Sequence, residues 1–92
     1  SAFALEQNYP NPFNPATNIR FSVAQAGHVS LKVYNVLGVE VASLVNEQKE
    51  LGTFNVNWNA SELSSGIYLY RLSVTSDEGQ VFEQSKKMTL LK

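Results

Sequence analysis

The residue types that most often do chemistry in proteins are sparse in this chain of 92 residues. His28 is its only histidine, it follows Gly27 at the start of an expected strand, and the chain has no cysteine. A nucleophilic triad needs a base held beside the nucleophile and a third group that orients the base. No second histidine is present to complete such a constellation. We therefore interpret His28 as a solvated residue at a strand end.

The acidic residues are scattered through polar stretches of the sequence. Only two pairs lie close together, Glu47 with Glu50 and Asp77 with Glu78. Acid–base catalysis needs two carboxyls whose pKa values are pushed apart by different environments. Both pairs fall in expected polar loops, where the charged form stays hydrated. We therefore predict that the chain is not an enzyme.

The nearest approach to a metal-binding loop is Asp77-Glu78-Gly79. Calcium sites need several oxygen ligands at loop spacing around a turn glycine. Three residues are too short for such a loop, and a hairpin turn accounts for them fully. We therefore expect neither a metal nor a cofactor.

Three aromatic residues raise the alternative of a carbohydrate-binding module, because small β-sandwiches often stack sugars on exposed rings. Trp58 shares its sequence parity with Phe54 and Val56, and the other two candidates share theirs with Leu72 and Val74: Tyr68 and Tyr70. Residues of one parity face one side of a strand. This placement favours the core for all three rings, although parity alone does not exclude exposure at a strand end.

Composition favours one folded domain with a modest core. The chain is 43% hydrophobic and 16% charged, with a formal net charge of −1. A domain of this length buries about 60–65% of the surface of its unfolded chain. The small net charge is unsuited to neutralising phosphate backbones, so nucleic acid is not an expected partner. No stretch approaches about 18 consecutive apolar residues, so no transmembrane segment is expected.

Alternation of apolar and polar residues predicts an all-β domain. It is clear over residues 18–23, 29–34, 54–59, 67–75 and 81–91, and it fails late in residues 39–45. Lost alternation is typical of a strand near a bulge or a sheet edge. Six or seven short strands, with no helix of ordinary length, predict an antiparallel β-sandwich.

The connections between these strands are also expected from local composition. Residues 46–52 are polar and charged and predict a loop, and residues 60–63 suit a single helical turn capped by Asn59 or Ser61. Two tight hairpin turns are expected at Asn35-Val36-Leu37-Gly38 and Ser76-Asp77-Glu78-Gly79. Both end in glycine, which accepts the left-handed conformation that follows a type I turn in a bulged hairpin.

All three prolines of the chain fall in the stretch Asn8-Tyr9-Pro10-Asn11-Pro12-Phe13-Asn14-Pro15. Proline fixes φ at about −65° and has no N–H to give to a ladder, and it pushes the preceding residue toward extended conformations. We expect a stiff rod that is not a central strand and that Phe13 anchors along a sheet edge. Whether a partner also recognises the rod is left open.

The C-terminus carries a small basic cluster formed by Lys86, Lys87 and Lys92. Lysines on an edge strand hinder pairing of its free N–H and C=O groups with another chain. This protective role is enough to explain the three lysines from the residues alone.

Several short motifs occur along the chain in the order expected of one family. The first is Leu5-Glu6-Gln7-Asn8 through Pro15, followed by Ala16-Thr17-Asn18-Ile19-Arg20-Phe21. Further along come Val33-Tyr34-Asn35-Val36-Leu37-Gly38, Trp58-Asn59-Ala60, Ser65-Gly66-Ile67-Tyr68 and the closing Lys87-Met88 with Leu90-Leu91-Lys92. Together they resemble the C-terminal sorting domain of the type IX secretion system over nearly the whole chain. The specific part is Pro-Asn-Pro-Phe-Asn-Pro.

Immunoglobulin-like domains of flagellar hook-assembly proteins share much of this pattern. They usually carry a longer insertion, rich in Asp and Gly, between the Trp element and the Gly-aromatic element. Here that connection is short, from Asn59 to Ser65, which favours the sorting domain.

The resemblance implies a single immunoglobulin-like β-sandwich of about six to seven strands that directs a larger cargo protein to the cell surface. The implied partners are a cargo domain upstream, the outer-membrane secretion machinery and a sortase-like surface protease that removes the domain. The implied location is the periplasm in transit, then the outer membrane, the cell surface or the medium. The alternative is an accessory immunoglobulin-like or carbohydrate-binding module of a secreted enzyme.

The resemblance also divides the chain and suggests which residues are recognised. Residues 1–7 are expected to be a linker remnant, in which Phe3 and Leu5 begin to pack, and residues 8–92 the sorting domain. The last strand and the terminal residues carry the export signal in the family. The candidate recognition residues are Pro10, Asn11, Pro12, Phe13, Asn14, Pro15, Lys86, Lys87, Leu90, Leu91 and Lys92.

Overall fold

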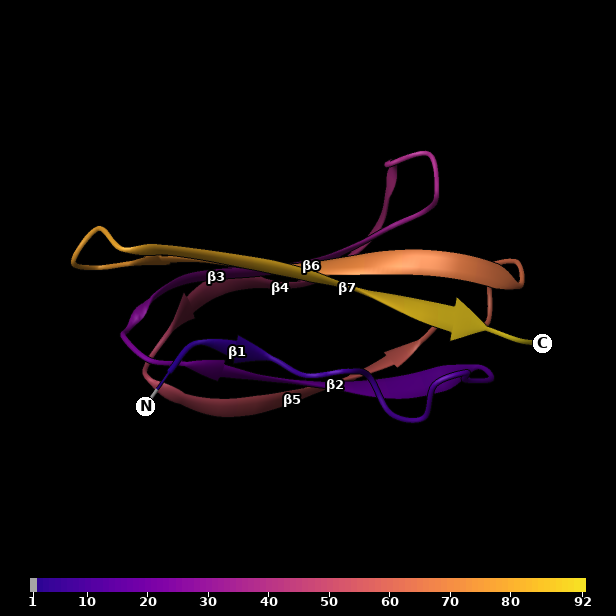
Figure 1. The fold of residues 1–92 in the computed structure, drawn as a ribbon, viewed down its shortest axis with the longest axis horizontal. Helices are drawn as coiled ribbons and strands as arrows, with labels where there is room; N and C mark the ends of the chain where they lie inside the picture. Colours follow the sequence, from indigo (N-terminus) through magenta and orange to yellow (C-terminus); the bar gives the residue numbers. More distant parts are fainter. Residues whose placement is uncertain (1) are drawn as a thin grey trace.

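The alternating stretches form strands that place one parity inside a sandwich and the other parity in solvent. The computed structural model describes residues 2–92 and contains two antiparallel sheets, with no helix in that part of the chain (Figure 1). The strands are β1 (Ala4–Leu5), β2 (Ala16–Val23), β3 (Gly27–Tyr34), β4 (Glu40–Lys49), β5 (Gly52–Asn59), β6 (Gly66–Ser76) and β7 (Val81–Leu90). The predicted all-β, immunoglobulin-like sandwich is confirmed.

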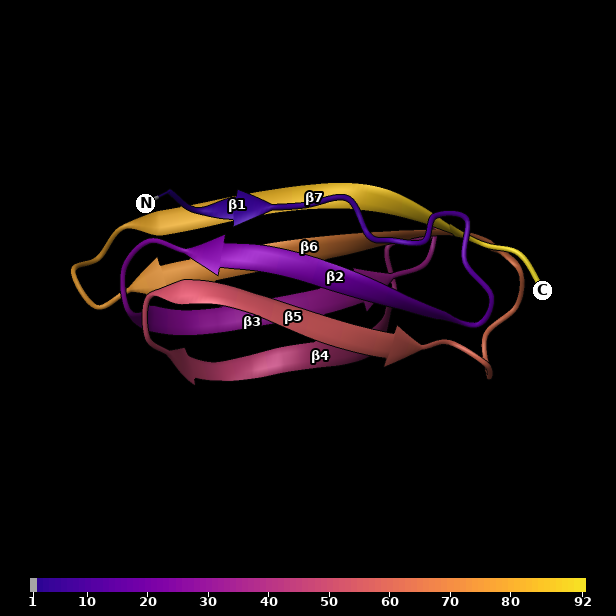
Figure 2. The same cartoon turned by 90° about the horizontal axis from the view of Figure 1, so that it is seen from below.

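The smaller sheet has the strand order β1-β2-β5, and the larger sheet has the order β4-β3-β6-β7. Figure 2 shows the smaller sheet stacked on one face of the larger one. The inward residues of the central strands are fully buried: Ile19, Phe21 and Val23 on β2, Val29, Leu31 and Val33 on β3, and Tyr70, Leu72 and Val74 on β6. Because the chain has no disulfide to hold the sheets together, their cohesion depends on this apolar layer.

Both predicted hairpin turns are present. Gly38 and Gly79 have φ values of 81° and 89°, in the left-handed region that glycine enters without strain. In the first turn, the side-chain oxygen of Asn35 accepts hydrogen bonds from the N–H groups of Leu37 at 2.9 Å and Val39 at 3.0 Å. That turn belongs to the β3–β4 hairpin, whose tip rises away from the sandwich (Figure 1).

The expected loop over residues 46–52 is wrong, because β4 continues to Lys49 and only Glu50 and Leu51 connect it to β5. Asn46, Glu47 and Gln48 are exposed although they pair with β3. A strand at the edge of a sheet can carry polar residues on both faces, so polarity was a poor guide here. The predicted loss of alternation has its cause in two register shifts between β3 and β4.

Two smaller expectations also need correction. Residues 60–63 form a hydrogen-bonded turn rather than a helix, closed by the N–H of Leu63 donating to the carbonyl of Ala60 at 3.0 Å. The side-chain oxygen of Asn59 accepts from the N–H of Ser61 at 2.9 Å, so the expected cap by Asn59 is present. The sandwich also begins before residue 8. Ala4 and Leu5 pair with β2, and Leu5 is buried, so part of the expected linker belongs to the smaller sheet. The expectation for Ser1 lies outside the described residues.

Candidate functional site

The proline segment (residues 8–15) joins the two sheets at one side of the sandwich. Tyr9 pairs with Asn18 through hydrogen bonds of 3.0 and 2.9 Å, which attaches the segment to the smaller sheet. Phe13 then pairs with Leu90 at the end of β7: the N–H of Phe13 donates to the carbonyl of Thr89 at 2.9 Å, and the N–H of Leu91 donates to the carbonyl of Phe13 at 3.0 Å. The segment therefore crosses from β2 of the smaller sheet to β7, an edge strand of the larger sheet.

A buried group of polar side chains holds this segment in a bend. The side-chain nitrogen of Asn8 donates to the hydroxyl of Thr17 at 3.0 Å and to the carbonyl of Pro10 at 3.2 Å. The Thr17 hydroxyl donates to the same carbonyl at 2.8 Å. Both side chains are buried, so the partners offset the cost of removing them from water. The segment is thus ordered, but it bends between the two sheets instead of running as a rod along one sheet edge.

Tyr70 connects the start of the proline segment to the larger sheet. Its ring is fully buried on β6, and its hydroxyl donates to the carbonyl of Glu6 at 2.7 Å and accepts from the N–H of Asn8 at 2.8 Å. Burial raises the pKa of Tyr70 to about 12, and the hydrogen bond from Asn8 opposes that rise only in part. The hydroxyl therefore stays neutral and able to donate at physiological pH.

Phe13 anchors the segment in the core, as its sequence position predicted. Its side chain is 2% exposed, and its ring packs against Trp58 with centroids 6.0 Å apart and planes inclined by 47°. Trp58, Tyr68 and Tyr70 are themselves buried. The prediction that these three aromatics serve the core is confirmed.

The structure brings the two candidate segments of the sequence together. The side-chain oxygen of Asn11 accepts from the N–H of Thr89 at 3.0 Å across 78 positions of sequence. The side-chain nitrogen of Gln7 donates to the carbonyl of Lys87 at 2.7 Å. With the Phe13–Leu90 pair, these bonds make the proline segment and the end of β7 one continuous surface.

Exposure divides the candidate residues into anchors and accessible groups. Phe13 and Leu90 are buried and act as anchors, while Pro15 and Lys86 are half-buried. The accessible members are Pro10, Asn11, Pro12, Asn14, Lys87, Leu91 and Lys92. Leu91 is 55% exposed.

The lysines do not gather into one basic cluster. Lys86 and Lys87 are successive residues of β7 and so point to opposite faces of the sheet. Lys92 turns toward the connection between β5 and β6, where its ammonium donates to the carbonyl of Ser61. Its N–H donates to the hydroxyl of Ser65 at 2.9 Å.

Sequence reasoning did not select three residues that shape this surface. Thr17 and Tyr70 are polar groups whose partners lie far along the chain, and a periodic pattern does not reveal such partners. Tyr9 was noted only as a residue carried by the segment, yet it is 81% exposed beside Pro10. A large aromatic directly before Pro10 was the available signal.

His28 and Asp77 form side-chain hydrogen bonds with neutral amides rather than with each other. His28 is exposed, and its Nε2 shares a hydrogen bond of 2.7 Å with the side-chain oxygen of Asn46. Asp77 accepts from the amide of Gln48 at 3.0 and 3.1 Å. Within residues 2–92 no three His, Cys, Asp or Glu side chains are grouped to hold a metal ion. Over the same range, no helix has the length and apolar character to cross a membrane.

The fold and this surface define a small immunoglobulin-like sandwich whose opening segment and terminal strand are joined. The family model for the secretion system C-terminal sorting domain matches residues 7–88. The chain therefore belongs to the C-terminal sorting domains of the type IX, or Por, secretion system.

Solved structures show the same fold at low sequence identity. Dimeric latent PorU from Porphyromonas gingivalis superposes with a TM-score of 0.74 at 20% identity, over 99% of this chain and 10% of the PorU chain. This chain thus spans about a tenth of that protein. CopC from Methylosinus trichosporium OB3b superposes with a TM-score of 0.55 at 19% identity, over 97% of this chain and 93% of CopC. No curated protein matches the chain significantly.

Proposed function

We propose that this domain directs a larger cargo protein through the type IX secretion system to the cell surface and is then cleaved off. The family supports the sorting role. The observation that carries the proposal is the continuous surface made by the proline segment and the end of β7. In this proposal the domain has no catalytic activity, and the cargo precedes it in the same chain. The route leads through the periplasm to the outer membrane, where the cargo stays on the surface or is released.

The secretion machinery is proposed to contact the accessible part of that surface. The side chains of Tyr9 and Leu91 are exposed to solvent. The backbone that carries them is held in place by the buried, paired residues Phe13 and Leu90. A preorganised surface costs little ordering entropy when a partner binds. The exposed candidates Pro10, Asn11, Pro12, Asn14, Lys87 and Lys92 surround these two residues in the proposed interface, while Pro15 and Lys86 contribute from half-buried positions.

Cleavage by the sortase-like surface protease is proposed to fall upstream of Ala4. A protease needs a segment of chain that is accessible and free to adapt to its active site. Ala4 and Leu5 are paired with β2, and the carbonyl of Glu6 is held by Tyr70. Intact-mass analysis of the domain released from a cargo fusion tests this. A released fragment beginning at or after Leu5 would contradict it.

The sorting role is tested by fusing the domain to the C-terminus of a periplasmic reporter in a bacterium with a type IX system. Tyr9→Ser and Leu91→Ser together remove the two exposed apolar groups and leave the buried anchors in place. We expect the reporter to accumulate in the periplasm while the melting temperature of the isolated domain stays within a few degrees of the unaltered one.

The matched control is the pair Leu51→Ser and Val81→Ser. These residues are 62% and 63% exposed and lie at the other end of the long axis, in the β4–β5 connection and at the start of β7 (Figure 2). We expect this variant to be exported normally. Normal export of the Tyr9/Leu91 variant would contradict the proposed contact surface. Failed export of the unaltered fusion would contradict the sorting role itself.

A further inference from the structure

The two sides along which the sheets meet edge to edge, β1 with β7 and β4 with β5, differ in how fully other residues cover them. On the side of β1 and β7, Phe3 stacks on Phe82 with centroids 5.3 Å apart, and the proline segment covers the gap beyond them. On the other side, β4 and β5 form a seam along which five apolar residues are only half-buried, although Val45 and Trp58 on the same strands are buried. The seam residues are Val41, Ala42, Leu44, Phe54 and Val56. Within residues 2–92, no segment covers them as the proline segment covers the opposite side.

The edge strands of the two sheets also differ in how well they are protected against pairing with another chain. Exposed edges invite pairing with another chain, and proteins blunt them with charges, bulges, short strands or a cover. β1 has two residues, β4 has charges and two register shifts, and β7 has charges and is partly covered by Asn11 and Phe13. β5 carries no charged residue, and its register with β2 runs without a shift from Gly52 to Asn59. Its outer edge is therefore the unprotected one.

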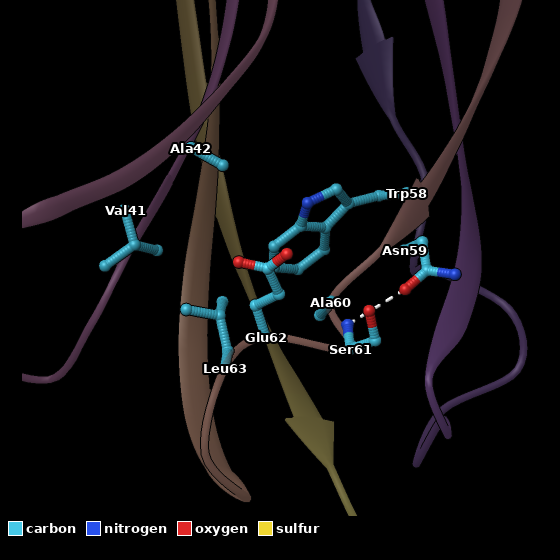
Figure 3. A pocket seen from close by; sticks show the side chains of 8 residues that line it. All are labelled: Val41, Ala42, Trp58, Asn59, Ala60, Ser61, Glu62 and Leu63. Carbon is cyan, nitrogen blue, oxygen red and sulfur yellow. Dashed lines mark hydrogen bonds between the residues drawn. The ribbon is translucent and has the colours of Figure 1, made fainter.

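A cavity of about 480 Å³ lies at the C-terminal end of β5. Trp58, Val41, Ala42 and Leu63 give it apolar walls, and Glu62 contributes a carboxylate. Figure 3 shows the indole of Trp58 and the carboxylate of Glu62 facing the same opening. Glu62 takes part in none of the ion pairs formed among the described residues. An aromatic ring, apolar walls and one unpaired carboxylate suit a side chain with an apolar stem and a cationic end.

We propose that β5 receives an extended strand of a partner protein that places a lysine or arginine side chain in the Trp58–Glu62 cavity. The strand pairs along the free edge of β5 and covers the β4–β5 seam with apolar residues at every second position. The proline segment shows the same device within this chain, because Phe13 pairs with β7 and buries its ring against Trp58. Pairing of two copies through β5 would leave Glu62 without a cationic partner, because β5 has no basic residue.

This site lies on the side of the sandwich away from the β1–β7 seam, and the inference does not depend on the sorting role. It is tested with the purified domain, so its failure is separate from a failure of export. The probe is a short synthetic peptide in which valine alternates with threonine and one lysine follows. The comparison peptide has glutamate in place of the lysine.

Amide NMR shifts and Trp58 fluorescence report binding. We expect saturable binding of the lysine peptide, with shifts concentrated in residues 53–59. Affinity for the glutamate peptide should be lower by about tenfold, the size of a charge-assisted pair.

Two variant pairs separate charge recognition from strand pairing. Glu62→Lys should reverse the preference between the two peptides. Glu78→Lys makes the same change of charge in the β6–β7 turn and should leave the preference unchanged. Val56→Lys puts a charge into the seam and should abolish binding, whereas Asn57→Lys puts it on the exposed face of β5 and should retain binding. The charge reversal remains a test if Val56→Lys fails to fold.

Several results would overturn the proposal. One is the absence of saturable binding, and another is a set of shifts centred on β4 or β7. A third is an unchanged preference in Glu62→Lys. The fourth is self-association in sedimentation that moves the β5 amides without peptide, which would make the edge a contact between two copies.

Discussion

Replacing Tyr70 with phenylalanine tests how firmly the proline segment is attached to the sandwich. The ring remains, so no cavity is created, but the hydroxyl that bonds to both Glu6 and Asn8 is lost. Asn8 is buried, so its N–H is left without a partner. An orphaned buried donor costs about 1–3 kcal/mol, a substantial part of the 5–15 kcal/mol typical of a domain.

The pH dependence of that loss gives a second readout. The pKa of Tyr70 is raised to about 12 by burial, against about 10 for an ordinary tyrosine. A group with a raised pKa in the folded state contributes stability below its unfolded pKa and loses it as pH rises through its folded pKa. The unaltered domain should therefore lose about 2–3 kcal/mol between pH 10 and 12 from this group. The Tyr70→Phe variant has no such group, so the stability gap between the two proteins should narrow over that window.

Urea unfolding of both proteins at pH 7 and at steps up to pH 11.5 measures the gap. Titration of the other groups is common to the two proteins and cancels in the difference. A Tyr70→Phe variant within about 0.5 kcal/mol of the unaltered domain at pH 7, the size of an ordinary surface change, would refute the attachment. A gap that stays constant to pH 11.5 would refute the assignment of the raised pKa.

Three further substitutions test separate parts of the fold. Phe13→Ala should lower the free energy of unfolding by about 3–5 kcal/mol, because transfer and cavity terms add at a buried ring; a calorimetric change under 0.5 kcal/mol would place the ring in solvent. Gly27→Ala should destabilise by about 1–3 kcal/mol or more, because its Cβ would clash with the carbonyl oxygen of Thr75; an unchanged urea midpoint would contradict this contact. Asn35→Ala should cost about 1 kcal/mol by loss of two turn hydrogen bonds, and retention of full thermal stability would show the turn forms without them.

The strands could be predicted from the sequence because the alternation of apolar and polar residues shows which face of each strand is buried. The alternation around Phe21 and Leu72 assigned their side chains to the interior, and the glycines at 38 and 79 marked the hairpins. Phe13 was expected as an anchor because a stiff backbone on both sides makes a ring inexpensive to bury. Each of these inferences depends only on residues that are close together in the sequence, and such local patterns can be recognised from a single sequence.

The rest of the fold depends on contacts between distant residues. Nothing near Phe13 indicates that its backbone pairs with Leu90. Parity placed Tyr70 inside the sandwich but did not identify the two backbone groups that its hydroxyl would meet. β1 is only two residues long, too short for a pattern, and its pairing is set by β2. The candidate site was therefore predicted as two separate segments, and only the folded chain makes them one surface.

The elongated shape of the domain sets a distance between its two ends. The sandwich measures 41 Å along its long axis, with β1 beginning at one end and the proline segment and the C-terminus at the other (Figure 2). A cargo joined upstream of Ala4 would leave from the end opposite the proposed contact surface. The sandwich would then act as a spacer, so that one docking site could serve cargoes of different bulk without touching them.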